Sequence, residues 1–442
     1  MKSPSVSDIS IVTVNWNGRH HLERLLPSLL PLGAREILLV DNGSSDGSVE
    51  FVRESYPQVR ILQNDRNRGF SQPNNWAARE ATGDFLAFIN NDMRAHPDWL
   101  SASAARLETS VCVASRILNW EGDRIDFNGS SFQFLGYALQ QDIGKLVDEV
   151  RSEDQILFPC GGAMVISRQV FLEAGGFDED YFAVFEDVDL GWRLWILGHR
   201  VHFCPDSLVF HRGHGTFQAH HNAKLRYLMH RNALLTVIKN YETELLTRIF
   251  PIAVFQAVKR AVRCSGVQKE SLHIWHTSSE RILAGDQAAW VEAVDALNHL
   301  VALDDVIELL PRMLAKRARI QEHRKRDDGD ILKLFKDPLR AIVADKRYIS
   351  QELDLLELMD LETLFDTSRY RHEAEKAIDP LAFRIDDLRA EVARIQALGV
   401  GALLHPSPQT PPSRIRKFLR TWKNVGPKAA IKLLGGAVRR GL

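Results

Sequence analysis

Two carboxylates in this sequence directly follow apolar runs, an arrangement that suits ligand binding at the end of a strand. Asp41 ends the run EILLVD, and Asp92 follows LAFINN, so that two amides, Asn90 and Asn91, stand beside it. A hard divalent cation prefers oxygen ligands, and one protein carboxylate with substrate phosphates and water is an ordinary arrangement for Mg²⁺ or Mn²⁺. The segment therefore predicts a cation at Asp92 that is held mainly by the phosphates of a substrate. A turn in which the two asparagines bond to the backbone is the alternative.

A second group of acids suits proton transfer. Glu186, Asp187 and Asp189 stand in the run FAVFEDVDLGW, where helical spacing begins. Helix capping is one explanation, because negative side chains favour the first turn of a helix. We favour catalysis, because the aromatic neighbours would raise the pKa of a carboxyl group toward the range of a general base. His211 closes the run SLVFH and could complete the shell of a metal, although a structural role is commoner for an isolated histidine.

Other polar residues suit a nucleotide ligand. Asp41 begins the turn DNGSSDGS, and a carboxylate there can accept hydrogen bonds from a nucleobase or a ribose, while the glycines and serines expose backbone amides. Asn67, Arg68 and Gly69 precede a helical segment and could close over a diphosphate, with Arg68 supplying charge. Asn15 ends the first apolar run.

These residues need a scaffold that gathers them, and the first half of the chain predicts one. The runs ISIVTV, EILLVD, VRILQ and DFLAFIN have the length of strands and alternate with segments of helical spacing. This alternation predicts a mostly parallel sheet between helices. Ligands bind beyond the carboxyl ends of such strands, where the polar residues lie. MVIS, RVHFC and SLVFH predict further strands, and residues 187–197 predict a helix.

After residue 224 the pattern changes to long helices such as QAAWVEAVDALNHLVALDDVIELL. We predict an α/β domain over residues 1–235, a helical domain over 236–410 and a basic amphipathic tail over 411–442. The charged run AKRARIQEHRKRDDGD is interpreted as a solvated helix face. The spacing from Ile385 to Leu398 suits a seam against another helix, within the chain or across a homodimer. The tail suits peripheral contact with anionic lipid, and a disordered or core-docked tail is the other interpretation.

Composition sets the broad class. The chain has 442 residues, enough for two folding units, and its net charge of −1 argues against a nucleic-acid partner. Its four scattered cysteines favour a reducing compartment. The first residues lack the apolar run of a signal peptide, and no apolar stretch reaches the roughly 18 to 20 residues of a membrane span. We therefore expect a cytoplasmic protein whose membrane contact, if any, is peripheral.

Together these segments resemble the family-2 glycosyltransferases, inverting enzymes of the nucleotide-diphospho-sugar transferase (GT-A) fold. The resemblance covers about residues 8 to 235 and rests on the order of the motifs SIVTVNWNG, LLVDNGSSDGS, NRGFSQPNN, FINND in the place of a DxD motif, PCGGAMVISRQVFLEAGGFDEDYFAVFEDVDLGWR and VFHRGHGTF. It implies an α/β fold, with a mostly parallel mixed sheet between helices, followed by an α-helical C-terminal region. The chain is most similar to the bacterial rhamnosyltransferase-like branch, which builds O-antigen and other surface polysaccharides.

The resemblance also implies roles for particular residues. Asp187 would be the catalytic base, with Glu186 supporting it or orienting the acceptor. Asp92 would bind the metal, and His211 would reach the metal or the diphosphate. The implied cofactor is Mg²⁺ or Mn²⁺, the donor a dTDP- or UDP-linked nucleotide-diphospho-sugar, and the acceptor a glycan or a lipid-linked glycan. The residues assigned to donor binding are Asn15, Asp41, Asn67, Arg68, Gly69 and Asn91.

One position departs from the family pattern, because Asn90 stands where many relatives carry Asp, and the lost charge lowers the expected affinity for metal. Two other functions are compatible with such a sheet. A non-catalytic sugar- or nucleotide-binding protein would be expected to have lost some of its carboxylates, whereas here the series is intact. A nucleotidyltransferase would need a basic Gly-rich phosphate loop after the first strand, which NWNGRHHLERL does not supply.

Overall fold

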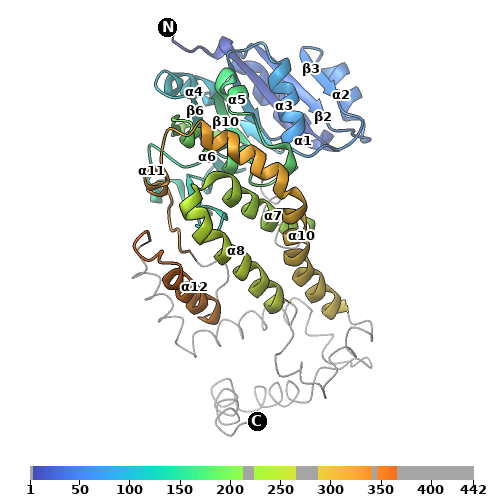
Figure 1. Cartoon of the computed structure of the whole chain (residues 1–442). Coiled ribbons are helices and arrows are strands. Elements are labelled where there is room, and N and C mark those ends of the chain that lie inside the picture. Colours follow the sequence, from blue (N-terminus) through green and yellow to red (C-terminus); the bar gives the residue numbers. More distant parts are fainter. Residues whose placement is uncertain (1–2, 213–222, 265–286, 341–345, 366–442) are drawn as a thin grey trace, which may run out of the picture. The chain divides into compact units, whose positions relative to one another are not determined.

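The computed structural model describes residues 3–212, 223–264, 287–340 and 346–365 of the chain (Figure 1). They lie within one compact unit, Met1–Arg371. The predicted seam from Ile385 to Leu398 and the predicted tail 411–442 are outside the described residues.

A mixed nine-stranded sheet forms the core of the N-terminal half. Four strands run parallel in the order β3-β2-β1-β4, as the alternating pattern predicts. Beyond β4 the sheet turns mixed, because β10 enters antiparallel between β4 and β6, and β11 then pairs parallel with β6 and antiparallel with β5. A short strand, β7, pairs with β6, and β8 pairs with β9 in a separate ribbon. The strands are β1 (Ile9–Asn15), β2 (Glu36–Asp41), β3 (Val59–Gln63), β4 (Phe85–Ile89), β5 (Met93–Ala95), β6 (Cys112–Asn119), β7 (Ile125–Phe127), β8 (Ser130–Phe132), β9 (Ala138–Gln140), β10 (Ala163–Ser167) and β11 (Val201–His211).

Helices cover the sheet and bury one apolar face each. In α1 the leucines at helical spacing, Leu22, Leu25, Leu26 and Leu29, are all fully buried. Helix α3 packs on β1 and β2, and α4 packs on β6 and β11. The helices of this half are α1 (Arg19–Leu29), α2 (Ser48–Ser55), α3 (Ser71–Glu80), α4 (Trp99–Leu107), α5 (Arg168–Glu173) and α6 (Glu186–Ile196), with 3-10 turns η1 (Val6–Asp8), η2 (Leu30–Leu32), η3 (Val147–Glu149) and η4 (Glu179–Tyr181).

The helical region that was predicted after residue 224 is confirmed. It comprises α7 (Ala223–Asn240), α8 (Thr243–Cys264), α10 (Gln287–Glu322), α11 (Asp328–Leu332) and α12 (Lys346–Leu358). Helices α7, α8 and α10 lie side by side and contact one another (Figure 1). An aromatic cluster joins this region to α6, because the Trp192 ring lies 4.8 Å from Tyr241 and 5.3 Å from Phe335, centroid to centroid.

Three sequence expectations change in the structure. RVHFC and SLVFH are one strand, β11, whose register shifts between Cys204 and Leu208. The charged run AKRARIQE ends α10, but Arg317 within it is buried and donates to the carbonyl oxygen of Ile238 at 2.8 Å, so this is not simply a solvated face. The predicted boundary at residue 235 falls inside α7, and an independent domain over residues 1–235 stays a prediction.

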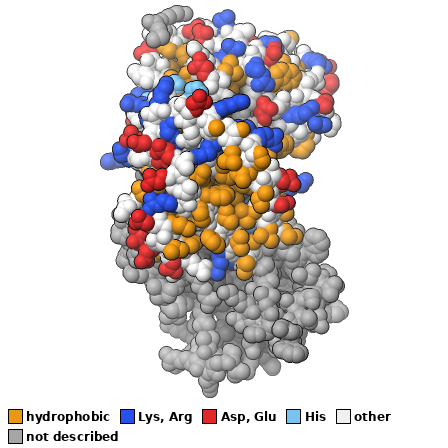
Figure 2. All heavy atoms as spheres, in the orientation of Figure 1, with side chains coloured by type: hydrophobic (Ala, Val, Ile, Leu, Met, Phe, Trp, Pro, Cys, Tyr) orange, Lys and Arg blue, Asp and Glu red, His pale blue; other side chains and the backbone are white. Residues whose placement is uncertain are grey.

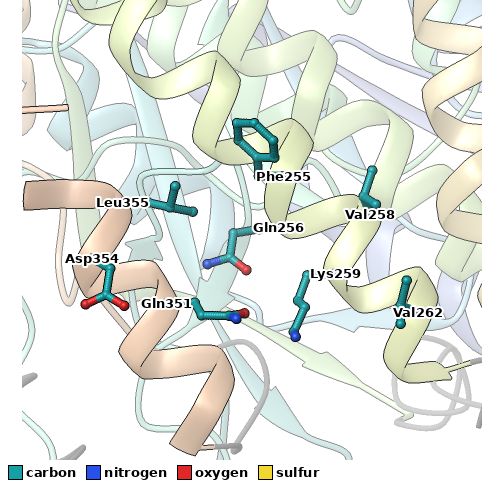
Figure 3. A pocket seen from close by; sticks show the side chains of 8 residues that line it. All are labelled: Phe255, Gln256, Val258, Lys259, Val262, Gln351, Asp354 and Leu355. Carbon is teal, nitrogen blue, oxygen red and sulfur yellow. The ribbon is translucent and has the colours of Figure 1, made fainter. Parts of the chain in front are cut away.

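Apolar side chains gather on one face of the helical region (Figure 2). The exposed apolar side chains of this region include Phe255 and Val262 on α8 and Leu300 on α10. A pocket of about 440 Å³ between α8 and α12 adjoins this face (Figure 3), and none of the predicted site residues lines it. No helix within the described ranges combines the length and the apolar character that a bilayer crossing requires.

Candidate functional site

Three of the predicted site residues meet where β1 and β2 end. Asn15 closes β1 and is paired in register with Asp41, which closes β2. Asn15 Nδ2 donates to Asp41 Oδ1 at 3.4 Å, and Asn15 Oδ1 accepts from Asn91 Nδ2 at 2.9 Å. The parallel pairing of the strands thus brings residues 26 and 76 positions apart into one hydrogen-bonded chain.

The Asp41 carboxylate organises its own turn. It is 1% exposed, and its Oδ2 accepts from the backbone N–H of Gly43 at 3.2 Å and of Ser44 at 3.0 Å. Both of its oxygens therefore have partners within the protein. The predicted contact of Asp41 with a nucleobase or ribose stays a prediction.

The loop of Asn67, Arg68 and Gly69, which are also predicted to bind the nucleotide, lies against the turn that follows Asp41. Asn42 Nδ2 donates to the carbonyl oxygen of Gly69 at 2.7 Å, and Asn67 Oδ1 accepts from the Gly69 N–H at 2.8 Å. Arg68 pairs with Asp65 at 2.8 Å, with both side chains exposed. Exposed pairs contribute little stability, so an anionic ligand could compete for the Arg68 guanidinium.

Asp92 and His211, the predicted metal ligands, are in contact. His211 Nε2 lies 3.1 Å from Asp92 Oδ2, and His211 Nδ1 is hydrogen-bonded to Asp126 of β7. The pairing of β11 with β5 places His211 opposite Met93, the residue after Asp92. The other oxygen of Asp92, Oδ1, is buried and has no hydrogen-bond partner among the described residues.

Asp92 and His211 each stabilise the charged form of the other. Burial opposes the protonation of His211, but hydrogen bonds to Asp126 and Asp92 raise its pKa to about 10. Burial likewise opposes the ionisation of Asp92, but the hydrogen bond and charge of His211 hold its pKa below the ordinary value. The pocket around Asp92 thus favours a positive charge next to the carboxylate.

The donor set at Asp92 fits a hard divalent cation. A buried carboxylate oxygen without a partner, beside an imidazole, can join a coordination shell that phosphate and water complete. Over the described ranges, no three His, Cys, Asp or Glu side chains are grouped so as to share a metal ion. The protein would therefore supply fewer than half of the ligands of the cation, and phosphate and water would supply the others. This agrees with the single carboxylate of the FINND segment.

The acid pair Glu186 and Asp187 opens α6. Asp187 Oδ2 accepts from the Gly161 N–H at 2.7 Å, and its Oδ1 accepts from the Val188 N–H at 2.8 Å, so the carboxylate is held in one orientation. Burial raises the pKa of Asp187, against the effect of these hydrogen bonds. For Glu186, burial and the charge of Asp187 raise the pKa well above the ordinary value, and its Oε2 has no partner among the described residues. Both carboxyl groups thus have raised pKa values, and the two backbone N–H groups favour the charged form of Asp187.

The four residues before this pair have an unusual backbone. Phe182, Val184 and Phe185 have φ angles of +64°, +72° and +68°, in the left-handed region that residues other than glycine seldom enter. Such conformations cost about 1 to 3 kcal/mol each and cluster at functional sites. We refer to Phe182–Phe185 as the strained segment.

Part of the sequence matches the model of a known protein family. Residues 10–175 match the model for glycosyl transferase family 2. This range contains the strand ends with Asn15 and Asp41, the Asp92 segment and Gly161. Residues 10–175 of this chain are a glycosyl transferase family 2 region. The resemblance that the motifs indicated is confirmed at the level of this family, and the chain is a glycosyltransferase.

Curated relatives of this glycosyltransferase are similar over about half of the chain. An N-acetylglucosaminyl-diphospho-decaprenol L-rhamnosyltransferase of Mycobacterium tuberculosis is 27% identical over 51% of the chain and 85% of the relative. A pre-mycofactocin glycosyltransferase of the same organism is 29% identical over 47% of the chain and 43% of the relative. The O-antigen biosynthesis protein RfbC of Myxococcus xanthus is 29% identical over 47% of the chain but only 17% of its own length.

Among solved structures, GalNAc-T7 in complex with UDP, GalNAc and Mn²⁺ is 16% identical to the glycosyltransferase. The likeness covers 68% of this chain and 57% of that one, with a TM-score of 0.44.

Sequence reasoning missed two parts of the site. Asp126 orients the His211 imidazole, as carboxylates behind metal-binding histidines do, but it stands in an irregular region, interpreted as strands and loops at the sheet edge, that offered no chemical motif. The polar face of α7 was also missed, although its spacing of three and four residues within RYLMHRNALLTVIKNY is a visible signal. All its members are buried, namely Arg231, Asn232, Thr236, Lys239 and Asn240.

Asp189, the third acid of the motif, has a structural role in the glycosyltransferase. It is fully buried and accepts from Arg193 Nε at 2.8 Å and from Asn240 Nδ2 at 3.0 Å. Lys239 Nζ lies 2.8 Å from it and 2.6 Å from Asp178. The motif therefore contains an acid pair and, two residues later, the centre of a buried ion network that joins α6 to α7.

Gly69 offers a test of the contact between the nucleotide loop and the strained segment. Its φ is +82°, and a Cβ atom there would overlap the carbonyl oxygen and ring of Phe182. We expect Gly69→Ala to destabilise the fold by about 1 to 3 kcal/mol and to weaken donor binding, since the two segments must separate. Denaturant unfolding and donor titration measure the two effects. Gly33→Ala is the control, because Gly33 has a similar φ of +74° with open space around it. Equal effects of the two variants would contradict the steric argument.

Proposed function

We propose that this glycosyltransferase transfers a sugar, with inversion at the anomeric carbon, from a nucleotide-diphospho-sugar to a hydroxyl of a saccharide or lipid-linked glycan. The observation that carries the proposal is the acid pair, in which the Asp187 carboxylate is fixed by two backbone N–H groups beside Glu186, a second buried acid whose pKa burial raises. This is the arrangement that a general base for an acceptor hydroxyl needs.

In the proposed reaction Asp187 takes the proton of the acceptor hydroxyl. The acceptor oxygen bonds to the anomeric carbon as the bond from that carbon to the donor diphosphate breaks, and the nucleoside diphosphate leaves. One displacement inverts the configuration. The hydrogen bonds from Gly161 and Val188 hold the Asp187 carboxylate in place, so little reorganisation is needed at the moment of transfer.

Asp92 would hold Mg²⁺ or Mn²⁺, joined by His211 once its Nε2 has lost the proton that it shares with Asp92. The bound cation would neutralise the charge that develops on the leaving diphosphate. Asp126 keeps the His211 ring oriented toward Asp92. Asn15, Asp41, Asn91 and the loop with Arg68 would surround the nucleotide.

The relatives suggest a narrower proposal for donor and acceptor. One relative is named as an L-rhamnosyltransferase that acts on a diphospho-decaprenol-linked sugar, and another as an O-antigen biosynthesis protein. We therefore propose a dTDP- or UDP-linked donor, with L-rhamnose as the first sugar to test, and a role in bacterial surface polysaccharide assembly. Peripheral membrane contact and a homodimer stay predictions, because the tail and the seam lie outside the described residues.

The donor proposal is tested by thermal stabilisation with a panel of nucleotide-sugars, each with and without Mn²⁺ or Mg²⁺. We expect dTDP-L-rhamnose or a UDP-sugar to stabilise the protein only with the cation. A ligand at 100 times its dissociation constant adds about 2.7 kcal/mol to the free energy of unfolding.

Asp92→Ala should lose the part of this stabilisation that depends on the cation, because it removes the predicted metal ligand. Asp98→Ala is the matched control, since Asp98 is exposed and follows the same segment. Stabilisation of Asp92→Ala by cation and donor to the parent level would refute the metal site. A panel in which no nucleotide-sugar binds would refute the donor class.

A further inference from the structure

The strained segment does not hold its conformation through its own residues. Three of its four members have positive φ angles, and Val184 is β-branched, which makes such a conformation particularly unfavourable. A segment of this kind persists only where its surroundings impose it. The source of that constraint lies on α7.

Asn232 of α7 binds the backbone of the segment. Its Nδ2 lies 2.6 Å from the carbonyl oxygen of Val184, 2.9 Å from that of Ala183 and 3.1 Å from that of Tyr181. The side chain is fully buried. Arg231 Nε donates to Asn232 Oδ1 at 3.0 Å, which fixes the orientation of the amide with its N–H groups toward the carbonyls.

Arg231 extends the same contact toward η4. Its guanidinium donates to the carbonyl oxygens of Asp180 at 2.9 Å and Tyr181 at 3.0 Å. Thr236, one turn further along α7, is hydrogen-bonded to the Tyr181 hydroxyl at 2.9 Å. Side chains of α7 thus form hydrogen bonds to the backbone between Asp180 and Val184, just before the acid pair.

Both ends of the strained segment lead to the site. Phe185 is the residue from which α6 and its acid pair begin. At the other end, the Phe182 carbonyl oxygen accepts from the backbone N–H groups of Phe70 at 2.6 Å and Ser71 at 3.2 Å, directly after the loop with Gly69. A shift of the segment would therefore move the acid pair relative to the nucleotide loop.

We propose that Asn232 is a positioning residue for sugar transfer, which holds the strained segment so that Asp187 keeps its place relative to the donor. The proposal rests on the proposed function of Asp187 and adds a residue that touches neither donor nor acceptor. Asn232 carries it because its single amide contacts three backbone carbonyl oxygens within four residues, in a conformation that these residues would not prefer by themselves.

Two variants test the proposal against a matched control. Asn232→Ala removes the amide, and Asn232→Asp keeps its shape but sets a carboxylate oxygen against the carbonyl oxygens. Val237→Ala is the control, because Val237 is fully buried on the same helix and its truncation costs packing but removes no hydrogen bond to the strained segment. Each variant is made in the full-length chain and is compared with the parent protein at a temperature where both are folded.

Activity is measured as kcat and as the KM for the donor, so that an effect on the rate of transfer can be told apart from an effect on donor binding. A displacement of about 1 Å at a reacting group can reduce the rate by about 10²-fold, so we expect both Asn232 variants to lose kcat by about 10- to 100-fold with a much smaller change in donor KM. Val237→Ala should keep the parent kcat. Parent-level kcat in both Asn232 variants, or an equal loss in Val237→Ala, would overturn the positioning role.

A measurement without substrate keeps this inference separate from the proposed function. Amide hydrogen exchange of the peptide that spans residues 179–190 should be faster in Asn232→Ala than in Val237→Ala, because the strained segment opens. Unchanged exchange in that peptide would overturn the constraint itself. Failure of the parent protein to transfer any sugar would refute the proposed function instead, whatever the exchange result.

Discussion

Replacing Asp187 with asparagine is expected to reduce the rate of sugar transfer by about 10²- to 10⁴-fold, the usual loss when a general base is removed. Asparagine keeps the size and one of the two acceptor oxygens, so the hydrogen bond from the Gly161 N–H can remain while the one from Val188 is lost, and the fold should persist. The amide has no basic oxygen for the acceptor proton. Steady-state rates with the donor found in the binding panel measure the loss.

Two further measurements separate this effect from general damage. Donor-dependent thermal stabilisation should be retained, since Asp187 is not assigned to donor binding. Glu186→Gln is the matched control, because it replaces the neighbouring buried carboxyl group with a neutral isostere, and the loss of rate should be clearly smaller. A parent rate in Asp187→Asn, or a larger loss in Glu186→Gln, would reject Asp187 as the base.

The pH profile of the parent follows from the same groups. Because burial raises the pKa of Asp187, the base is lost to protonation at a higher pH than for an ordinary aspartate. The rate should therefore fall as the pH is lowered through that raised pKa, and recover above it. An acid limb in the ordinary range of an exposed aspartate would contradict the buried environment.

Replacing Asp189 with alanine is expected to lower the free energy of unfolding by about 3 to 5 kcal/mol, the range for breaking a buried ion pair. The substitution leaves Arg193 and Lys239 buried with less compensating charge, since both lie 2.8 Å from the Asp189 carboxylate. Lys239 keeps its contact with Asp178, which limits the loss. Denaturant unfolding measures the change.

Asp330→Ala is the control for this prediction. Asp330 also pairs with a cation one turn away, Lys333 at 2.7 Å, but both side chains are exposed. Exposed pairs contribute little to stability, so the control should be almost neutral. Similar losses in the two variants would show that burial of the network is not what makes Asp189 important.

The contribution of Asp189 depends on pH in a defined direction. Burial opposes its ionisation, but the charges of Arg193 and Lys239 lower its pKa below the ordinary value. Its stabilising effect is therefore fully present above the pKa of the unfolded chain, about 3.9, and is lost as the pH falls through the lower pKa of the folded state. The difference between the parent and Asp189→Ala should shrink on acidification.

Much of the fold could be predicted because its signals are local. The four parallel strands and α1 follow from runs of apolar residues and from the spacing of Leu22, Leu25, Leu26 and Leu29, and such periodicity reflects which side of an element is buried. The order of the strands then places Asn15, Asp41 and Asn91 together, since parallel strands end at one edge. Asp92 and His211 were paired by the same logic and do meet.

The sequence by itself therefore determined the type of sheet, the edge at which polar residues collect and the family to which the motifs belong. The tertiary structure alone decided which of Glu186, Asp187 and Asp189 has which environment, because their partners come from residues 26 to 51 positions away, such as Gly161 and Asn240. It also decided that Asp126 lies behind His211, 85 positions away, and that Asn232 holds the strained segment. The reason is physical: periodicity records burial within one element, whereas the charge and orientation of a side chain depend on partners that only folding brings near.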